Sequence, residues 1–313
     1  MTTDVAIVGA GPAGITAAIY ALRAGLDVTV FEKNIYGGQT SIIENIENYP
    51  GFLKISGPDF SNALYEQAKN FGAKFVFSEV TDVDFSSEEK ILKTSSGKTI
   101  SAKSVIISNG LKRRTLGCIG EKEFFGKGVS YCATCDGAFF KDKSVAVVGG
   151  GNTALEDALY LSNICKNVAI IVRKNTFRAE NILVQSVNNT ENISVIFESN
   201  VKEIIGEKVV QKITIENKNS EISEIKIDGV FIAIGYEPDS KIYQGKIKID
   251  DYGYFVAGED CKTSVEGVFV AGDCRAKPLR QIATAISDGA VAGSSASKFV
   301  MMKKLNSKWG KPL

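Results

Sequence analysis

The chain has 313 residues, of which 44% are hydrophobic and 23% are charged, and 37 basic side chains nearly balance 36 acidic ones. This length predicts two domains that each bury a core, and a net charge of +1 gives no sign of a nucleic acid partner. The sequence contains no histidine, which excludes imidazole bases, Ser-His triads and His-ligated metal sites. Six cysteines are too few for a disulfide scaffold and indicate a reducing cytoplasm.

The first feature along the chain is an uncharged run, Val5–Leu22, which is long enough to be scored as a membrane span. Pro12 and three glycines interrupt this run. A buried strand over Asp4–Val8, a tight turn and a buried helix ending at Arg23 explain it better, so we expect no membrane association.

The turn between this strand and helix has the spacing of a dinucleotide site. Gly9 permits the turn, Gly11 lets the backbone approach a pyrophosphate, and Gly14 lets the helix pack closely on the strand, with the helix N-terminus directed at the anion. The next strand, Asp27–Phe31, is followed by Glu32, whose carboxylate suits a ribose diol. The predicted binding residues are Gly9, Gly11, Pro12, Ala13, Gly14 and Glu32.

A cysteine pair follows near the middle of the chain. Two residues separate Cys132 from Cys135, and at the start of a helix this spacing brings the sulfurs into bonding range while the helix dipole lowers a thiol pKa. Half of a zinc ribbon is the alternative, but the sequence has no second such pair and no histidine. Asp136 is the candidate for proton exchange with a sulfur, with helix capping as its alternative role. The remaining cysteines are expected to be small buried hydrophobic residues: Cys118, Cys165, Cys261 and Cys274.

A second strand, glycine turn and helix begin at Ser144, and the helix is predicted to extend through Leu161. The next strand, Val168–Val172, is followed by basic residues where the first unit has an acid. Cations attract a 2′-phosphate, so this unit should prefer NADPH to NADH; a solvated basic strand end is the alternative. The candidate residues are Gly149, Gly151, Asn152, Thr153, Ala154, Arg173, Lys174 and, one helical turn further on, Arg178.

Two such units predict two dinucleotides, FAD beside Glu32 and NADPH beside the basic residues, a combination typical of flavin-linked oxidoreductases. Strand-plus-glycine stretches at Val105–Gly110 and Val230–Gly235 flank the second unit and indicate crossings between domains. We therefore predict an α/β protein with two Rossmann-like domains of three ββα layers. The FAD-binding domain comprises residues 1–112 and 241–313, and the inserted NADPH-binding domain, residues 115–240, carries the cysteine pair.

The C-terminal third contains a further strand that ends in Gly272 and Asp273, and Arg280 opens an Ala- and Gly-rich helix. Asp273 can bind a ribityl hydroxyl, and the N-terminal amides of that helix can stabilise negative charge on a reduced flavin. A plain strand-turn-helix packing unit is the alternative for Asp273.

Together these motifs resemble the bacterial low-molecular-weight thioredoxin reductases of the pyridine nucleotide-disulfide oxidoreductase family. The resemblance extends from about Asp4 to Gly293 and is carried by residues 9–14, 37–39, 47–51, 132–137, 149–154, 173–178, 272–273 and 280–281. It adds Gly38, Gln39, Asn48, Arg280 and Gln281 to the candidate FAD residues. It implies a homodimer in which NADPH reduces FAD, FAD reduces a Cys132/Cys135 disulfide, and the dithiol reduces thioredoxin.

The resemblance also implies individual roles: Cys135 faces the flavin, Cys132 attacks the thioredoxin disulfide, Asp136 is the acid, and the NADPH domain rotates against the FAD domain. The chain departs from the family's usual His-Arg-Arg at Val172-Arg173-Lys174, which predicts a weaker hold on NADPH. Some relatives lack this motif and the second glycine pattern and take electrons from ferredoxin instead. Because both features are largely intact here, a ferredoxin-dependent function is kept only as the alternative. Related dithiol oxidases carry histidine where this chain has Asp136, so reduction is favoured over oxidation. A non-catalytic nucleotide sensor with structural zinc is the alternative from another class.

Overall fold

The computed structural model describes residues 2–309, with side chains up to residue 306. The chain forms two compact units, Met1–Lys112 with Glu237–Leu313, here called the split unit, and Arg113–Tyr236, here called the inserted unit. The second boundary thus lies four residues before the one expected from the sequence. Its position has a physical reason, since Asp239 forms ion pairs with Lys33 (3.2 Å) and Lys112 (3.2 Å) and so belongs with the split unit.

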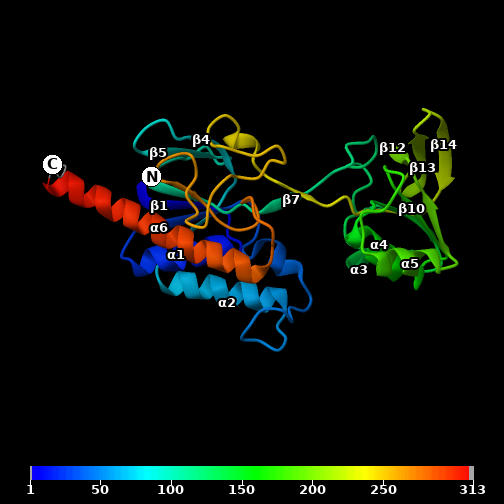
Figure 1. The fold of residues 1–313 in the computed structure, drawn as a ribbon, viewed down its shortest axis with the longest axis horizontal. Helices are drawn as coiled ribbons and strands as arrows, with labels where there is room; N and C mark the ends of the chain where they lie inside the picture. The colour runs from blue at the N-terminus through cyan, green and yellow to red at the C-terminus, as the bar shows by residue number, and fades with distance from the viewer. Residues whose placement is uncertain (1, 310–313) are drawn as a thin grey trace. The chain divides into compact units, whose positions relative to one another are not determined.

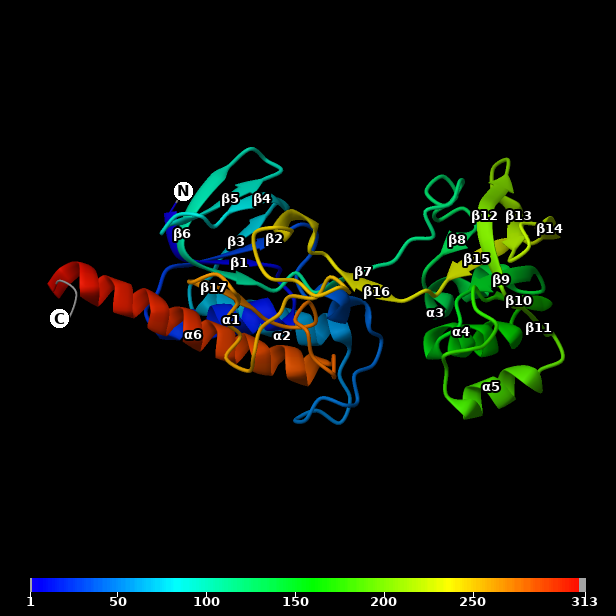
Figure 2. The same cartoon turned by 45° about the horizontal axis from the view of Figure 1, so that its top comes forward.

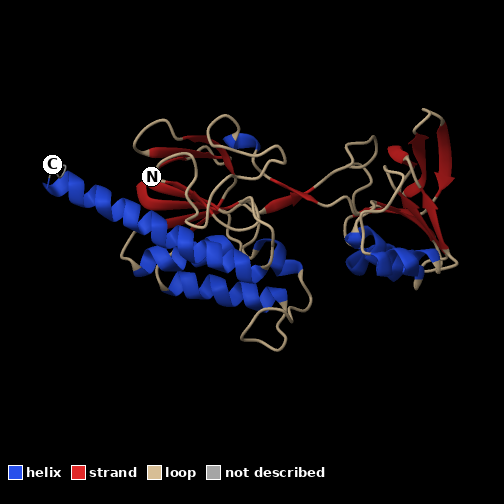
Figure 3. Cartoon of the chain, viewed as in Figure 1, coloured by secondary structure: helices blue, strands red, loops and turns tan. Residues whose placement is uncertain are grey.

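The split unit is built on a seven-stranded sheet in the order β3-β2-β1-β6-β5-β4, with β17 paired to β6. Its parallel strands are β1 (Thr2–Val8), β2 (Val28–Glu32), β3 (Lys74–Phe77), β6 (Thr99–Ile107) and β17 (Val268–Val270). β4 (Val80–Asp84) and β5 (Lys90–Thr94) extend it in antiparallel fashion. The helices α1 (Pro12–Arg23), α2 (Gly57–Asn70) and α6 (Ile282–Trp309) cover one face (Figures 1 and 3).

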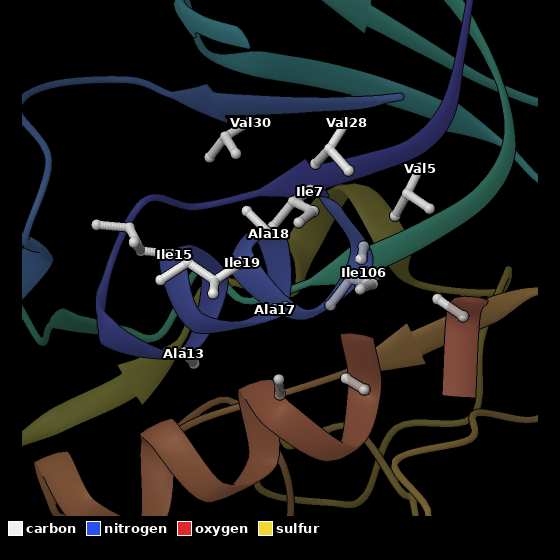
Figure 4. Close-up of a cluster of buried hydrophobic side chains, with 14 of the residues drawn as sticks. Val5, Ile7, Ala13, Ile15, Ala17, Ala18, Ile19, Val28, Val30 and Ile106 are labelled. Atoms are coloured by element: carbon white, nitrogen blue, oxygen red, sulfur yellow. The ribbon is translucent and has the colours of Figure 1, made fainter. Parts of the chain in front are cut away.

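Helix α1 lies between the sheet and α6, so its apolar residues are buried on both sides. Ile15 and Ile19 lie in the close-up with Val5, Ile7 and Val28 of the sheet, and α6 passes on the other side (Figure 4). A Cβ on Gly289 of α6 would lie 2.2 Å from the carbonyl oxygen of Ala13, so the two helices meet backbone to backbone. The uncharged run of the sequence is therefore strand, turn and core helix, as predicted. Over the described residues, no helix has the length and apolar character to cross a membrane.

The inserted unit has three layers (Figure 2). Its central parallel sheet has the order β11-β10-β9-β15-β8. The strands are β8 (Val129–Ser130), β9 (Ser144–Val148), β10 (Asn167–Ile171), β11 (Ile193–Ile196) and β15 (Gly229–Ile232). One face carries α3 (Ala133–Asp136), α4 (Asn152–Ser162) and α5 (Asn181–Asn188), and the other carries an antiparallel sheet of β12 (Ser199–Gly206), β13 (Val210–Asn217) and β14 (Ile222–Lys226). The predicted fold class is confirmed.

The two segments that connect the units are themselves ordered as strands. β7 (Leu111–Arg113) and β16 (Tyr236–Pro238) pair as a two-stranded sheet. Lys112 also approaches Glu237 at 3.7 Å. Both crossings of the chain therefore occur side by side, directly after the two strand-plus-glycine stretches that indicate them in the sequence.

Candidate functional site

A cavity of about 460 Å³ lies within the split unit, at the carboxyl ends of β1, β2 and β6. Loops at this edge of a parallel sheet are the usual place for a dinucleotide. Nine of the expected FAD residues line it: Gly9, Gly11, Pro12, Ala13, Glu32, Gly38, Gln39, Asp273 and Gln281. Asn48 and Arg280 line an adjoining cavity that also contacts Gln39, Asp273 and Gln281. Gly14 lines neither of these cavities.

Gly9 and Gly14 are required by close backbone contacts beside this cavity. Gly9 has φ +104°, and a Cβ on it would lie 2.4 Å from the carbonyl oxygen of Ser108 at the end of β6. A Cβ on Gly14 would lie 2.0 Å from the carbonyl oxygen of Gly9. No side chain caps α1 at Gly11, which leaves its first backbone amides available to an anion.

Glu32 lies at the edge of the cavity with its carboxylate held by two backbone amides. Oε2 accepts a hydrogen bond from the amide of Ala10 (2.9 Å), and Oε1 accepts one from the amide of Asn34 (3.0 Å). These bonds fix the carboxylate next to the glycine turn and leave lone pairs for hydroxyl donors.

Asp273 supplies the clearest indication of what this cavity can bind. Its Oδ1 is buried, and the structure gives it no hydrogen-bond partner in the described part of the chain. Burial raises the pKa of Asp273, against the opposing effect of the Lys277 and Arg280 charges. A hydroxyl donor in the cavity would satisfy this oxygen. The residues present therefore fit the polyol chain of a flavin dinucleotide.

The side chains beside Asp273 are held in place by hydrogen bonds to backbone carbonyls and to each other. Arg280 Nε donates to the carbonyl oxygen of Asp273 (3.2 Å), and the guanidinium lies 4.0 Å from the centre of the Tyr254 ring. Asn48 Nδ2 donates to Gln281 Oε1 (3.1 Å). Gln39 Nε2 donates to the carbonyl oxygen of Leu111 (2.9 Å).

Asn109 is a cavity residue that the sequence pattern does not single out. It lines the cavity after β6, and its buried Oδ1 also lacks a partner among the described residues. Its signal in the sequence is the strand-plus-glycine stretch Val105–Gly110, which the sequence analysis uses only to mark a domain crossing.

The cysteine pair lies in the inserted unit. Cys132 and Cys135 form a disulfide, with Cα atoms 5.3 Å apart. α3 is a single turn whose N-cap is Cys132, and the amide of Cys135 donates to Cys132 Sγ (3.2 Å). Cys135 is exposed and Cys132 is half-buried.

Asp136 does not cap this helix, because its carboxylate bonds to the preceding strand. Ser130 Oγ of β8 donates to Asp136 Oδ2 (2.6 Å) and accepts a hydrogen bond from the amide of Cys132 (3.0 Å). No motif in the sequence points to Ser130, since a lone serine carries no pattern.

The four other cysteines are free thiols. Cys165, Cys261 and Cys274 are buried as predicted, whereas Cys118 is half-buried. Burial raises the pKa of Cys118 and Cys165 to about 11 and that of Cys261 and Cys274 to about 12, so all four stay protonated at neutral pH. Within residues 2–306, no group of three acidic or thiol side chains is placed to hold a metal ion.

The second glycine turn repeats the features of the first. Gly149 has φ +150°, and a Cβ on it would lie 2.3 Å from the carbonyl oxygen of Ala233. α4 begins after Gly151 with no side-chain cap, so Asn152, Thr153 and Ala154 form its first turn. The backbone amides at its N-terminus are therefore available to an anion, as are those of α1.

The position predicted for Arg178 is wrong in one respect. Residues 172–180 form no helix, so Arg178 does not lie one helical turn beyond β10. Instead the segment turns back, and the amide of Arg178 donates to the carbonyl oxygen of Gly150 (2.6 Å). Arg173 and Lys174 are exposed at the end of the same strand. The turn brings the Arg178 backbone directly beside the glycine motif.

Comparison with known proteins shows which family the chain belongs to. A family model described as pyridine nucleotide-disulphide oxidoreductase matches residues 3–289. The chain belongs to this family. A thioredoxin reductase of Bacillus subtilis (strain 168) is 44% identical over 299 residues, covering 95% of this chain and 94% of that protein. One from Listeria monocytogenes is 43% identical, with 95% and 93% covered. Within the family, the chain groups with the low-molecular-weight thioredoxin reductases.

Solved structures of the family give the same result. Lactococcus lactis thioredoxin reductase, in a conformation labelled FR, aligns with a TM-score of 0.81 at 37% identity, covering 96% of this chain and 99% of that one. A ferredoxin-flavin thioredoxin reductase from Clostridium acetobutylicum aligns with a TM-score of 0.54 at 29% identity, covering 96% of this chain and 99% of that one. The ferredoxin-dependent alternative is therefore less well supported.

Proposed function

We propose that this chain is an NADPH-dependent thioredoxin reductase containing FAD. The observation that carries the proposal is the Cys132–Cys135 disulfide, with the Asp136 carboxylate linked through Ser130 to the Cys132 backbone, in the same unit as the second glycine turn. Once reduced, such a pair can attack a second disulfide as a thiolate, and the glycine turn gives the unit a place for a nucleotide.

FAD would occupy the cavity of the split unit. The amides of the Gly9–Gly14 turn would hold its pyrophosphate, Glu32 its adenosine ribose, and Asp273 a ribityl hydroxyl, because these groups line the cavity with free hydrogen-bonding capacity. When bound, FAD supplies the ability to pass an electron pair from a nicotinamide to a disulfide.

NADPH would bind at the second glycine turn. The amides at the start of α4 suit a pyrophosphate, and the side chains of Arg173, Lys174 and Arg178 suit a 2′-phosphate. The presence of this turn together with three cations favours NADPH over ferredoxin as the electron donor.

The cysteines would carry the electrons to the client by thiol-disulfide exchange. In the reduced pair, the Asp136 carboxylate takes the proton of the Cys132 thiol. The resulting thiolate attacks a sulfur of the thioredoxin disulfide, forming a mixed disulfide, and the released client thiolate takes this proton from Asp136. Cys135 then attacks Cys132 Sγ, which restores the disulfide and releases the dithiol form of the client. Ser130 keeps the Asp136 carboxylate beside the Cys132 backbone during both steps.

We also propose that the protein is a homodimer of the cytoplasm. The four free thiols are typical of a reducing compartment, and the family resemblance is the basis for the dimer.

The test is thioredoxin-dependent oxidation of NADPH by the purified protein. We expect turnover that requires both thioredoxin and NADPH and is far slower with NADH. Turnover that depends on reduced ferredoxin while NADPH is inert would replace this proposal with the ferredoxin-dependent one. Tightly held zinc together with thiols that resist oxidation would favour the nucleotide sensor.

A further inference from the structure

A cluster of buried charges lies behind the proposed flavin cavity and is not explained by ligand contact. Asp288 of α6 is 6% exposed and Arg275 is 5% exposed. Arg275 holds the Asp288 carboxylate at two points, Nη2 to Oδ1 (2.8 Å) and Nε to Oδ2 (3.0 Å). Lys277 Nζ donates to Oδ2 as well (2.9 Å). Burying three ionic groups is costly, so the arrangement needs a reason beyond stability alone.

Asp288 also bonds to the segment that carries Asp273. The amide of Gly272 donates to Asp288 Oδ2 (3.0 Å), and Arg275 is bonded to the same carboxylate. Asp288 thus holds Gly272 and Arg275, which lie on either side of Asp273 in the sequence. The Oδ1 atom of Asp273 itself has no hydrogen-bond partner among the described residues.

Three elements that border the cavity converge on this point. A Cβ on Gly272 would lie 2.9 Å from Ala13 Cβ, and a Cβ on Gly289 would lie 2.2 Å from the Ala13 carbonyl oxygen. The loop after β17, the start of α1 and the second turn of α6 are therefore in direct contact. Because packed interiors transmit displacement, movement of the loop against α6 would displace Asp273 at the cavity wall.

The carboxylate of Asp288 is ionised in this setting. Burial opposes ionisation, but hydrogen bonds from Arg275 and Lys277 outweigh it and hold the pKa of Asp288 below its usual value. Replacing the Asp288 carboxylate by an amide would leave the buried cations of Arg275 and Lys277 facing a neutral group whose NH₂ is itself a hydrogen-bond donor.

We propose that Asp288 is a positioning residue for the flavin site, which fixes the 272–275 segment against α6 so that Asp273 presents its free oxygen to the cavity. The inference rests on the proposed function, since it assumes that FAD occupies this cavity.

The test compares Asp288→Asn with Asp4→Asn in the full-length holoprotein. Asp4 is a matched control, because it is also part of a partly buried three-charge cluster and pairs with Lys103 (2.9 Å) and with Lys304 (2.8 Å) near the other end of α6. The readouts are the rate at which flavin fluorescence appears on dilution, the visible circular dichroism of the bound flavin, and the thermal midpoint.

We expect Asp288→Asn to release FAD roughly tenfold faster or more and to alter the flavin dichroism. Asp4→Asn should release FAD at the wild-type rate, within about twofold, with an unchanged dichroism even where its thermal midpoint falls. A folded but colourless Asp288→Asn protein counts as the same loss. Wild-type release and dichroism in Asp288→Asn would overturn the inference and leave the proposed function intact.

A double variant, Lys277→Met with Asp288→Asn, separates position from charge and decides the question if the single variant does not fold. It keeps the wild-type net charge of the buried cluster, so the positioning role predicts that fast release persists. If the double variant retains FAD as well as the wild type does, Asp288 serves only to balance the buried charges, and the inference is overturned. Failure of both variants to fold would overturn it as well. A wild-type chain that binds no flavin would instead refute the proposed function.

Discussion

Ser130 Oγ donates a 2.6 Å hydrogen bond to the Asp136 carboxylate while accepting a 3.0 Å bond from the amide of Cys132. One buried hydroxyl therefore sets the position of the proposed acid relative to the backbone of the proposed attacking cysteine. Proton transfer is efficient only when donor and acceptor are held within hydrogen-bond reach, so this link has consequences for turnover.

Asp136→Asn should lower the turnover number with thioredoxin by about a hundredfold or more, because general acid catalysis contributes on that order. Reduction of the flavin by NADPH should stay at the wild-type rate, since Asp136 acts after it. Stopped-flow and steady-state assays measure the two steps. Asp142→Asn, an exposed charge on the following loop, is the control and should change neither. An equal fall in both rates for Asp136→Asn would contradict the assigned role.

Cys135→Ser should abolish thioredoxin turnover and leave flavin reduction by NADPH intact, because it removes one sulfur of the disulfide. Cys118→Ser provides the control, since Cys118 is a free, half-buried thiol outside the pair. Activity in the Cys135→Ser protein above that of a blank would show that the pair is not on the electron path.

Arg178→Ala should raise the KM for NADPH by roughly tenfold to a hundredfold, the effect of losing a charge-assisted hydrogen bond. The KM for NADH should not change, because NADH lacks the 2′-phosphate. Lys174→Arg should act in the opposite direction, since a guanidinium fork holds a phosphate better than an ammonium does. Lys166→Gln removes an exposed cation of the same unit and serves as control. Parallel changes for both nucleotides would argue against a 2′-phosphate site.

Asp157→Asn should stabilise the inserted unit at neutral pH. Burial, followed by the charge of Glu156, raises the pKa of Asp157 from 3.8 to about 6. Folding therefore favours the protonated acid, so this stabilisation is complete below pH 3.8 and is lost as the pH rises through about 6.

The asparagine variant should gain about 1–2 kcal/mol in free energy of unfolding at about pH 8, less than the full linkage value because the side chain is partly open to water. The gain should vanish near pH 4, and urea unfolding at the two pH values measures it. Glu207→Gln, an exposed carboxylate of the same unit, should show no such difference. A loss of stability at neutral pH would indicate that the Asp157 carboxylate is paired.

Local patterns were sufficient to predict both glycine turns, because strand, glycine spacing and helix lie within one short stretch of chain. The same holds for the cysteine pair. Ser130, Asn109 and Asp288 could not be predicted, since each acquires its role from residues distant in sequence or from burial that no local pattern encodes. The turn that brings Arg178 back to Gly150 is likewise tertiary, because basic residues after a strand are equally compatible with a helix.

The most direct test of the account is anaerobic titration of the purified protein with NADPH, followed by flavin absorbance. We predict a yellow protein whose flavin is bleached by NADPH and which consumes more NADPH per flavin than the Cys135→Ser variant does. The excess is the electron pair stored in the Cys132–Cys135 disulfide. A colourless protein that cannot be reconstituted with FAD, or equal consumption by the two proteins, would contradict the account.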